Sequence, residues 1–220
     1  MILAAGRGDR LRPLTDTIPK PLIQVGPHAL IEHHLLRLAS AGLTDIVINL
    51  GWLGEQISDR LGDGSRYGVG ISYSQEPPGA LETAGGIRHA LAQLGDQPFL
   101  VVSADVVTDF PFDLLIDFEP VGLGHLVLVD NPPHHPEGDF GLERAQVNRN
   151  LPRYTFSGIG VLQAHWFQDL KPGPRPLRPL FERAIDQGQL TGQHYDGLWL
   201  DVGTPDRLTV ARKHYANPGR

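Results

Sequence analysis

The sequence predicts an α/β fold: a Rossmann-like, three-layer αβα arrangement around a mixed, mostly parallel central sheet. Three observations support this prediction. Strand-like apolar runs alternate with amphipathic helical patterns early in the chain, as in βαβ units. The 220 residues suffice to bury a full sheet between helices in a single domain, residues 1–220. Between about 105 and 160 the helical patterns give way to strands and Pro/Gly-rich loops.

Each expected element follows from its local pattern. Ile31, Leu35, Leu38 and Ala39 recur at helical spacing before Gly42, which predicts the first helix. The expected helices span residues 29–41, 53–61, 83–94, 177–187 and 205–215. The expected strands span residues 1–5, 45–50, 69–74, 99–104, 125–130, 154–162 and 194–200. Residues 217–220 are expected to fray.

Composition excludes several classes of function. The net charge is −6, and basic residues are scattered outside the first loop, so no extended nucleic-acid surface is expected. The chain has no cysteine, which excludes disulfides, thiolate metal sites and cysteine nucleophiles. A strand beginning at Met1 leaves no room for a signal peptide, and no apolar run approaches the ~20 residues of a bilayer span. A cytoplasmic protein without membrane partners is expected. No heptad or surface stripe indicates an oligomer.

The loop after the first strand has the features of a phosphate site. Gly6 and Gly8 let backbone N–H groups approach an anion, and Arg10, Arg12 and Lys20 supply positive charge. The alternative interpretation, a basic surface loop, becomes much weaker once the arginines and Lys20 are considered together.

The spacing in this loop distinguishes it from two better-known phosphate motifs. A Walker A loop needs Gly-Lys-Ser/Thr, and a dinucleotide fingerprint needs a third glycine where Leu11 stands. Pro19 and Pro21 restrict the backbone on either side of Lys20, which holds its amine in a defined place.

Two aspartates follow strand-like runs and are candidates for a metal site. Asp105 comes directly after residues 99–104, and Asp201 after residues 198–200. Thr204 is a candidate N-cap for the next helix, with Pro205 in its first turn. Mg²⁺ usually binds one or two carboxylates together with phosphate oxygens and waters, so these two would suffice. A lone aspartate at a strand end is more often a cap or turn residue.

The chain resembles the sugar-1-phosphate nucleotidyltransferases, whose signature runs G-x-G-x-R-L-x-P-L-T followed by P-K-P. The matching residues are Gly6, Gly8, Arg10, Leu11, Pro13, Leu14, Thr15, Pro19, Lys20 and Pro21. The similarity extends over essentially the whole chain and looks closest to the N-acetylmuramate-1-phosphate uridylyltransferases. LVLVDNPPHHPEGDF, LETAGG, TFSGI and LWLDVGT, at residues 126–140, 81–86, 155–159 and 198–204, resemble that subgroup.

This resemblance implies a reaction. A sugar-1-phosphate oxygen would attack the α-phosphorus of a nucleoside triphosphate, and pyrophosphate would leave. The expected pair is UTP with N-acetylmuramate-1-phosphate, in peptidoglycan recycling. Arg10 would neutralise the β- and γ-phosphates, Lys20 would bridge the sugar phosphate and the α-phosphate, and Asp105 with Asp201 would hold Mg²⁺.

The resemblance also implies which residues bind the substrates. Residues 1–105 would mainly bind the nucleotide, and residues 106–220 mainly the sugar phosphate. The implied nucleotide-binding residues are Leu3, Ala4, Ala5, Gly6, Gly8, Arg10, Glu76, Glu82, Thr83 and Gly86, with Thr83 also the expected cap of the helix at 83–94. The implied sugar-phosphate residues are Lys20, Gly141, Ser157 and Gly158.

The chain departs from its relatives in two places. Ala104 stands where relatives commonly have Gly before the metal aspartate, and the Glu-Lys pair that many of them carry before Phe156 has no clear match within residues 142–154. Two alternatives stay open: a guanylyl- or thymidylyltransferase acting on another hexose-1-phosphate, and a non-catalytic sensor subunit of the same fold. The second has no need of both aspartates.

The histidines do not predict a transition-metal site. His33 and His34 are adjacent on one expected helix, where their side chains point about 100° apart and cannot chelate one ion together. His134 and His135 lie in a Pro-rich loop, where solvated imidazoles or the rim of a substrate site are the better interpretation.

Overall fold

The computed structural model describes residues 1–216, so the fraying expected at 217–220 lies outside the described residues. The chain divides into two compact units, each assembled from several segments. Unit 1 contains Met1, Leu81–Val102 and Asp117–Gly197, and unit 2 contains Ile2–Ala80, Ser103–Ile116 and the chain from Leu198 onward. Both units combine helices with strands, which confirms the expected α/β class with a mixture of strand directions.

Unit 2 contains a parallel three-stranded arrangement, β5-β4-β1, in which β4 pairs with both neighbours. Its strands are β1 (Ile2–Leu3), β2 (Gln24–Val25), β3 (His28–Ala29), β4 (Asp45–Leu50), β5 (Gly70–Gln75), β7 (Val106–Thr108) and β13 (Trp199–Asp201). Its α-helices are α1 (Leu30–Ser40), α2 (Gly54–Leu61) and α6 (Pro205–Ala216). Short 3-10 helices cover Asp9–Leu11, Leu14–Asp16, Lys20–Leu22, Ser65–Tyr67 and Phe112–Leu115.

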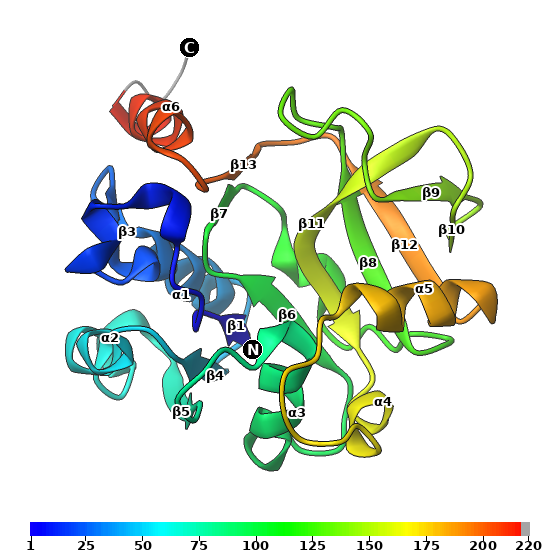
Figure 1. Ribbon diagram of the computed structural model, residues 1–220, viewed down its shortest axis with the longest axis horizontal. Coiled ribbons are helices and arrows are strands. Elements are labelled where there is room, and N and C mark those ends of the chain that lie inside the picture. The colour runs from blue at the N-terminus through cyan, green and yellow to red at the C-terminus, as the bar shows by residue number, and fades with distance from the viewer. Residues whose placement is uncertain (217–220) are drawn as a thin grey trace. The chain divides into compact units, whose positions relative to one another are not determined.

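Unit 1 is built around β11 (Arg153–Leu162), which pairs antiparallel with β6, β8 and β9 (Figure 1). The other strands are β6 (Phe99–Ser103), β8 (Gly124–Val129), β9 (Phe140–Glu143), β10 (Gln146–Asn148) and β12 (Leu190–Tyr195). Its helices are α3 (Glu82–Leu94), α4 (His165–Gln168) and α5 (Arg178–Asp186). The pair β12 with β8 is parallel, whereas β10 runs antiparallel to β9 and β12. The expected mostly parallel pairing therefore describes only β5-β4-β1 in unit 2, where β2–β3 and β7–β13 pair antiparallel, and it does not hold in unit 1.

One expected strand proves to be two. The run at 194–200 was expected to be continuous, but β12 ends at Tyr195 and β13 begins at Trp199. β12 pairs with β8 in unit 1, and β13 pairs antiparallel with β7 in unit 2. Asp196 and Gly197 lie between two segments that pair with different strands. The apolar pattern of the sequence alone does not indicate such a break.

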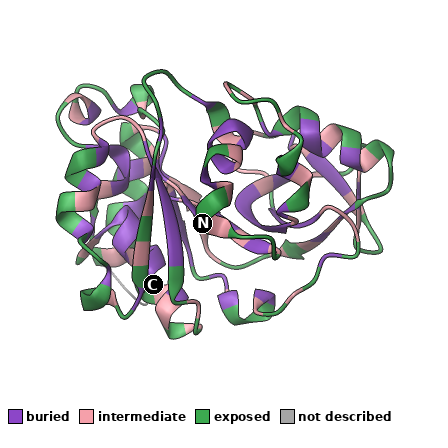
Figure 2. Cartoon of the chain, turned by 90° about the horizontal axis from the view of Figure 1, so that it is seen from below, coloured by how far each residue is buried: buried purple, intermediate pink, exposed green. Residues whose placement is uncertain are grey.

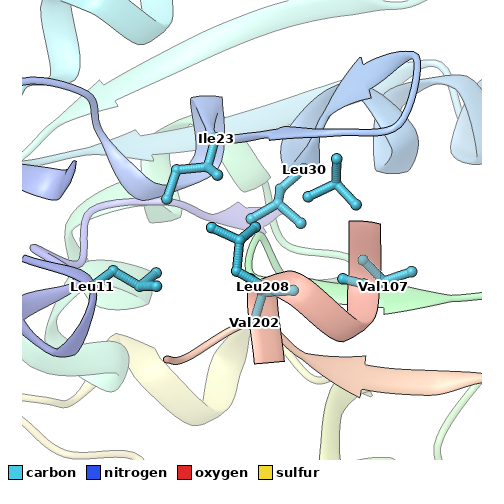
Figure 3. Packing of buried hydrophobic residues seen from close by; sticks show 8 residues of the cluster. Leu11, Ile23, Leu30, Val107, Val202 and Leu208 are labelled. Carbon is cyan, nitrogen blue, oxygen red and sulfur yellow. The ribbon is translucent and has the colours of Figure 1, made fainter. Parts of the chain in front are cut away.

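Buried apolar side chains fix α6 in unit 2. Leu208, on the first turns of α6, packs in a cluster with Val202 and with residues from the N-terminal segment (Figure 3). The buried members of the cluster are Leu11, Ile23, Val25, Leu30, Val107, Val202, Leu208 and Ala211. Thr204 Oγ1 accepts a hydrogen bond from the Arg207 N–H at 3.4 Å, which confirms Thr204 as the N-cap and Pro205 as the first helical residue. The helices have alternating buried and exposed positions, as amphipathic elements should (Figure 2).

Candidate active site

The loop after β1 brings Lys20 close to Gly8. Gly8 adopts φ 72°, and a Cβ built on it would lie 3.1 Å from Lys20 Cβ and 3.2 Å from Thr15 Cγ2. Thr15 Oγ1 donates a hydrogen bond to the Gly8 carbonyl at 2.9 Å. Only glycine combines this backbone conformation with so close an approach. Gly6, by contrast, would have open space around a Cβ, so its backbone is accessible.

A cation–π contact also anchors this loop. The Arg7 guanidinium lies 4.1 Å from the centre of the Trp52 ring and pairs with Asp9 and Asp16. The Trp52 indole N–H donates to the Thr15 carbonyl at 2.8 Å. Trp52 therefore links the segment just before α2 to the glycine loop.

The two candidate metal aspartates lie on one two-stranded ribbon. Asp105 directly precedes β7, and Asp201 ends β13 opposite Val106. The Val202 N–H donates to the Asp105 carbonyl at 2.8 Å, which continues the ladder past the paired strands. Both aspartates therefore stand at the same end of the β7–β13 ribbon, at adjoining backbone positions.

Each of these aspartates has a basic partner. Lys20 Nζ forms an ion pair with Asp105 Oδ2, and the Lys20 side chain is only 11% exposed. Arg207 Nη1 lies 2.6 Å from Asp201 Oδ2. In unit 2 the sequence-predicted residues Lys20 and Asp105 thus form one ion pair, and Asp201 forms a second one with Arg207. The two aspartates stand at the same end of the β7–β13 ribbon, and we call these four residues the charged cluster.

The Arg10 guanidinium also lies close to this cluster, beside Gly203. A Cβ built on Gly203 would collide with Arg207 Nη2 and lie 3.0 Å from Arg10 Nη2. Two guanidinium groups therefore approach the backbone one position beyond Val202. Sequence reasoning missed Arg207, although its place in the first turn of the helix that follows Asp201 was a usable signal.

A buried hydrogen-bond chain lies behind the strand end that is predicted to bind the nucleotide. The Ala4 N–H donates to Asn49 Oδ1 at 2.8 Å, and Asn49 Nδ2 donates to Glu76 Oε1 at 2.7 Å. Asn49 and Glu76 are 3% and 8% exposed. The Leu3 carbonyl accepts from the Ala104 N–H, and the Ala5 carbonyl from the Trp52 N–H. Asn49 was not predicted, because an asparagine inside an apolar strand carries no motif.

The remaining predicted nucleotide residues belong to unit 1, at the start of α3. The helix begins at Glu82, whose φ is 60°, and no side chain caps it. The Arg175 carbonyl instead accepts the N–H groups of Ala84 and Gly85, so the expected cap at Thr83 is wrong. A Cβ on Gly85 would lie 2.5 Å from the Gly173 carbonyl oxygen, so only a glycine at position 85 leaves room for the loop at 173–175 to pack against the helix. Gly86 is buried within the helix.

The predicted sugar-phosphate residues of unit 1 lie on β9 and β11. Gly141 pairs with Asn148, and a Cβ there would collide with Asn148 Oδ1 and the Asn150 carbonyl. The register of β11 against β8 shifts between Phe156 and Ile159, so Ser157 and Gly158 form a bulge, where Gly158 has φ 80°. Ser157 is buried, and its Oγ donates to the Val127 carbonyl at 2.7 Å.

An acidic residue next to this bulge was also missed by the sequence analysis. Asp139 Oδ2 accepts the Phe156 N–H at 2.9 Å, and Asp139 Oδ1 pairs with Arg178 Nη1 at 2.9 Å. Asp139 therefore ties the loop before β9 to the bulged part of β11 and to the start of α5.

Residues 1–216 contain neither a cluster of three metal-ligating side chains nor a membrane-length apolar helix. No group of three or more histidine or acidic side chains there is arranged to hold a metal ion. Asp105 and Asp201 form a pair of hard oxygen donors, a set that suits Mg²⁺ when phosphate and water supply the other ligands. Across the same residues, no helix combines the length and apolar character of a bilayer span.

Comparison with known proteins identifies the family. A family model described as nucleotidyl transferase matches residues 1–153. The N-acetylmuramate alpha-1-phosphate uridylyltransferase of Neisseria meningitidis serogroup B is 52% identical, with 96% of each chain covered. Its namesake from Caulobacter vibrioides is 31% identical over 98% of this chain and 96% of that one. A solved structure of a candidate glucose-1-phosphate thymidylyltransferase from Bacillus anthracis has the same fold, with a TM-score of 0.86 at 23% identity, covering 100% of this chain and 96% of that one. The chain belongs to the nucleotidyl transferase family.

Proposed function

We propose that this protein transfers a uridylyl group from UTP to N-acetylmuramate α-1-phosphate, forming the UDP-sugar and releasing pyrophosphate. The 52% identity to the Neisseria uridylyltransferase over nearly the full length of both chains carries this proposal. The clustering of Arg10, Lys20, Asp105 and Asp201 in unit 2 supports it, because these are the charged groups that such a transfer needs.

The proposed chemistry requires positioning and positive charge, not a covalent enzyme intermediate. An oxygen of the sugar phosphate forms a bond to the α-phosphorus, while the bond from that phosphorus to the β-phosphate oxygen breaks. The nucleophile is already anionic near neutral pH, so a general base would add little. The protein instead has to hold two mutually repelling anions in line.

The proposed roles follow from the cluster. Arg10, which has an accessible guanidinium beside Gly203, neutralises the β- and γ-phosphates. Lys20 moves its amine from Asp105 to the α-phosphate and the sugar phosphate. Asp105 and Asp201 would hold Mg²⁺, which supplies positive charge to the phosphate oxygens when bound.

Substrate recognition is proposed for the other predicted residues. In unit 2, the strand-end backbone at Leu3, Ala4, Ala5, Gly6 and Gly8 contacts the nucleotide together with Glu76. In unit 1, Glu82, Thr83 and Gly86 contribute to nucleotide binding, and Gly141, Ser157 and Gly158 to binding of the sugar phosphate. We also retain a cytoplasmic location, a role in peptidoglycan recycling, and the division into a nucleotide half (1–105) and a sugar-phosphate half (106–220) as proposals.

The test is pyrophosphate release by the purified protein. Each of the common nucleoside triphosphates is assayed with N-acetylmuramate-1-phosphate, N-acetylglucosamine-1-phosphate, glucose-1-phosphate and mannose-1-phosphate in the presence of Mg²⁺. Release that is fastest with UTP and N-acetylmuramate-1-phosphate supports the proposal. Preference for GTP or dTTP with another hexose phosphate would establish a different transferase. No release with any pair, in a folded protein that binds nucleotide, would indicate a sensor subunit.

A further inference from the structure

Two internal cations occupy the aspartates proposed for the metal. Lys20 pairs with Asp105, and Arg207 Nη1 lies 2.6 Å from Asp201 Oδ2. The side chains of Lys20, Arg207 and Asp201 are largely shielded from solvent, at 11%, 16% and 21% exposed, whereas that of Asp105 is 35% exposed. Arg10 adds a third positive charge next to Gly203, and among residues 1–216 it has no carboxylate partner.

This charge balance opposes a free divalent cation. Both carboxylates are already neutralised, and the extra guanidinium leaves the cluster positive before any ligand arrives. A divalent cation bound at Asp105 or Asp201 would be repelled by Lys20 and Arg207, which are largely buried and weakly screened, and to a lesser degree by the exposed Arg10.

Binding of a nucleoside triphosphate reverses this balance of charge. Its phosphates attract the amine and the guanidinium groups, which frees carboxylate oxygens and adds negative charge at the same place. This inference rests on the proposed metal site. We propose that Arg207 is a positioning residue that prevents a free divalent cation from binding to Asp201 until the triphosphate binds. Metal and nucleotide then bind together, and neither forms a stable partial complex in the transfer site.

The fold of α6 allows this role to be separated from stability. Leu208 and Ala211 hold the helix in the apolar core, and Thr204 caps it, so neither anchor needs the Arg207 guanidinium. Arg212 offers a matched control on the same helix: it is exposed and donates from Nε to the Gln24 carbonyl at 3.1 Å. Arg207→Met and Arg212→Met remove the same charge from the same element.

The experiment measures Mn²⁺ binding to the nucleotide-free protein by electron paramagnetic resonance. Wild type and Arg212→Met are expected to bind Mn²⁺ weakly. Arg207→Met should bind it at least about fivefold more tightly, because a repelling charge and a competitor for Asp201 are both removed. Arg207→Lys, which keeps the charge, should restore weak binding. Unfolding midpoints of all four proteins verify that they are folded.

Calorimetric titration of UTP, with and without Mn²⁺, separates this inference from the metal assignment itself. In wild type, Mn²⁺ should increase the affinity for UTP, and Asp201→Asn should abolish that gain in affinity. If this gain is present but Arg207→Met binds Mn²⁺ no better than wild type without UTP, the role of Arg207 is wrong and the metal site stands. If Mn²⁺ does not affect UTP binding in wild type, both the metal site and the role of Arg207 are wrong.

Discussion

Asn49 joins the end of β1 to Glu76: its amide accepts the Ala4 N–H and donates to Glu76 Oε1 at 2.7 Å. All of these groups are buried, so each depends on the other for a hydrogen bond. The carboxylate of Glu76, an implied nucleotide-binding residue, is thereby oriented by a side chain from strand β4.

Replacing Asn49 with Ala should destabilise the protein. The Ala4 N–H and a Glu76 oxygen would lose a partner inside the protein, at a cost of ~1–3 kcal/mol. Urea unfolding measures the change, and KM for UTP should rise as Glu76 loses its orientation. Asn150→Ala, at an exposed asparagine, is the control and should change neither quantity. Equal stability of Asn49→Ala and wild type would show that water replaces the amide.

Replacing Arg10 with Ala should slow turnover without unfolding the protein. The side chain is exposed and supports no core packing, but it would lose the phosphate contact in the transition state. By analogy with oxyanion donors the loss is ~2.7–4 kcal/mol, which corresponds to about 10²–10³ in kcat/KM. Arg212→Ala, which removes an exposed guanidinium of α6 that has no proposed role in the site, is the control. Near-normal turnover of Arg10→Ala at saturating Mg²⁺ would refute the phosphate role.

Replacing Gly203 with Ala tests whether the two guanidinium groups must meet there. The new methyl would collide with Arg207 Nη2 and crowd Arg10 Nη2, both of which are ends of flexible side chains. The free energy of unfolding should therefore change by less than about 1 kcal/mol, while kcat falls roughly tenfold or more. Gly70→Ala, where a Cβ meets nothing within 4 Å, is the control. Unchanged kcat in Gly203→Ala would mean that the positions of these side chains do not matter.

Glu32 should make the stability of the protein depend on acid pH. Burial alone would raise the pKa of Glu32, but hydrogen bonds from Tyr67, the Ala29 N–H and Arg60 outweigh it and hold the pKa at about 2, below the ordinary 4.5. The unfolded chain recovers the ordinary pKa. The stabilisation is therefore complete above about pH 4.5 and is lost as the pH falls toward about 2.

The Glu32→Gln variant should lose this dependence. Its free energy of unfolding should be lower than that of wild type near neutral pH, and the difference should shrink as the pH falls from 4.5 toward 2. Denaturant unfolding at a series of pH values measures both curves. Glu55→Gln, at an exposed position of α2, serves as the control and should follow wild type. Parallel curves for Glu32→Gln and wild type would contradict the lowered pKa.

Local patterns predicted the longer helices and strands because burial and backbone preference agree there, but they missed the short α4 and the short strands β2, β3, β7, β9 and β10. α1 buries Ile31, Leu35 and Leu38 at helical spacing, and β4 occupies the expected residues 45–50. The glycine loop could also be recognised from the sequence, because the close approach of Gly8 to Lys20 leaves no room for another residue than glycine at position 8.

What the sequence could not provide is pairing between distant segments. The break between β12 and β13 depends on which partners the two strands find, and the capping of α3 by the Arg175 carbonyl depends on a remote loop. Asn49 was missed because its partners Ala4 and Glu76 lie 45 and 27 positions away, a pairing that no local pattern reveals.

The ribbon of β7 and β13 fixes how far apart Asp105 and Asp201 can be. A short ladder, not a large sheet, determines their spacing. Substitutions that weaken other parts of the fold should therefore lower the melting temperature well before they change the distance between the two aspartates. Evolution could thus remodel the parts that recognise base and sugar while the chemistry at phosphorus stayed the same.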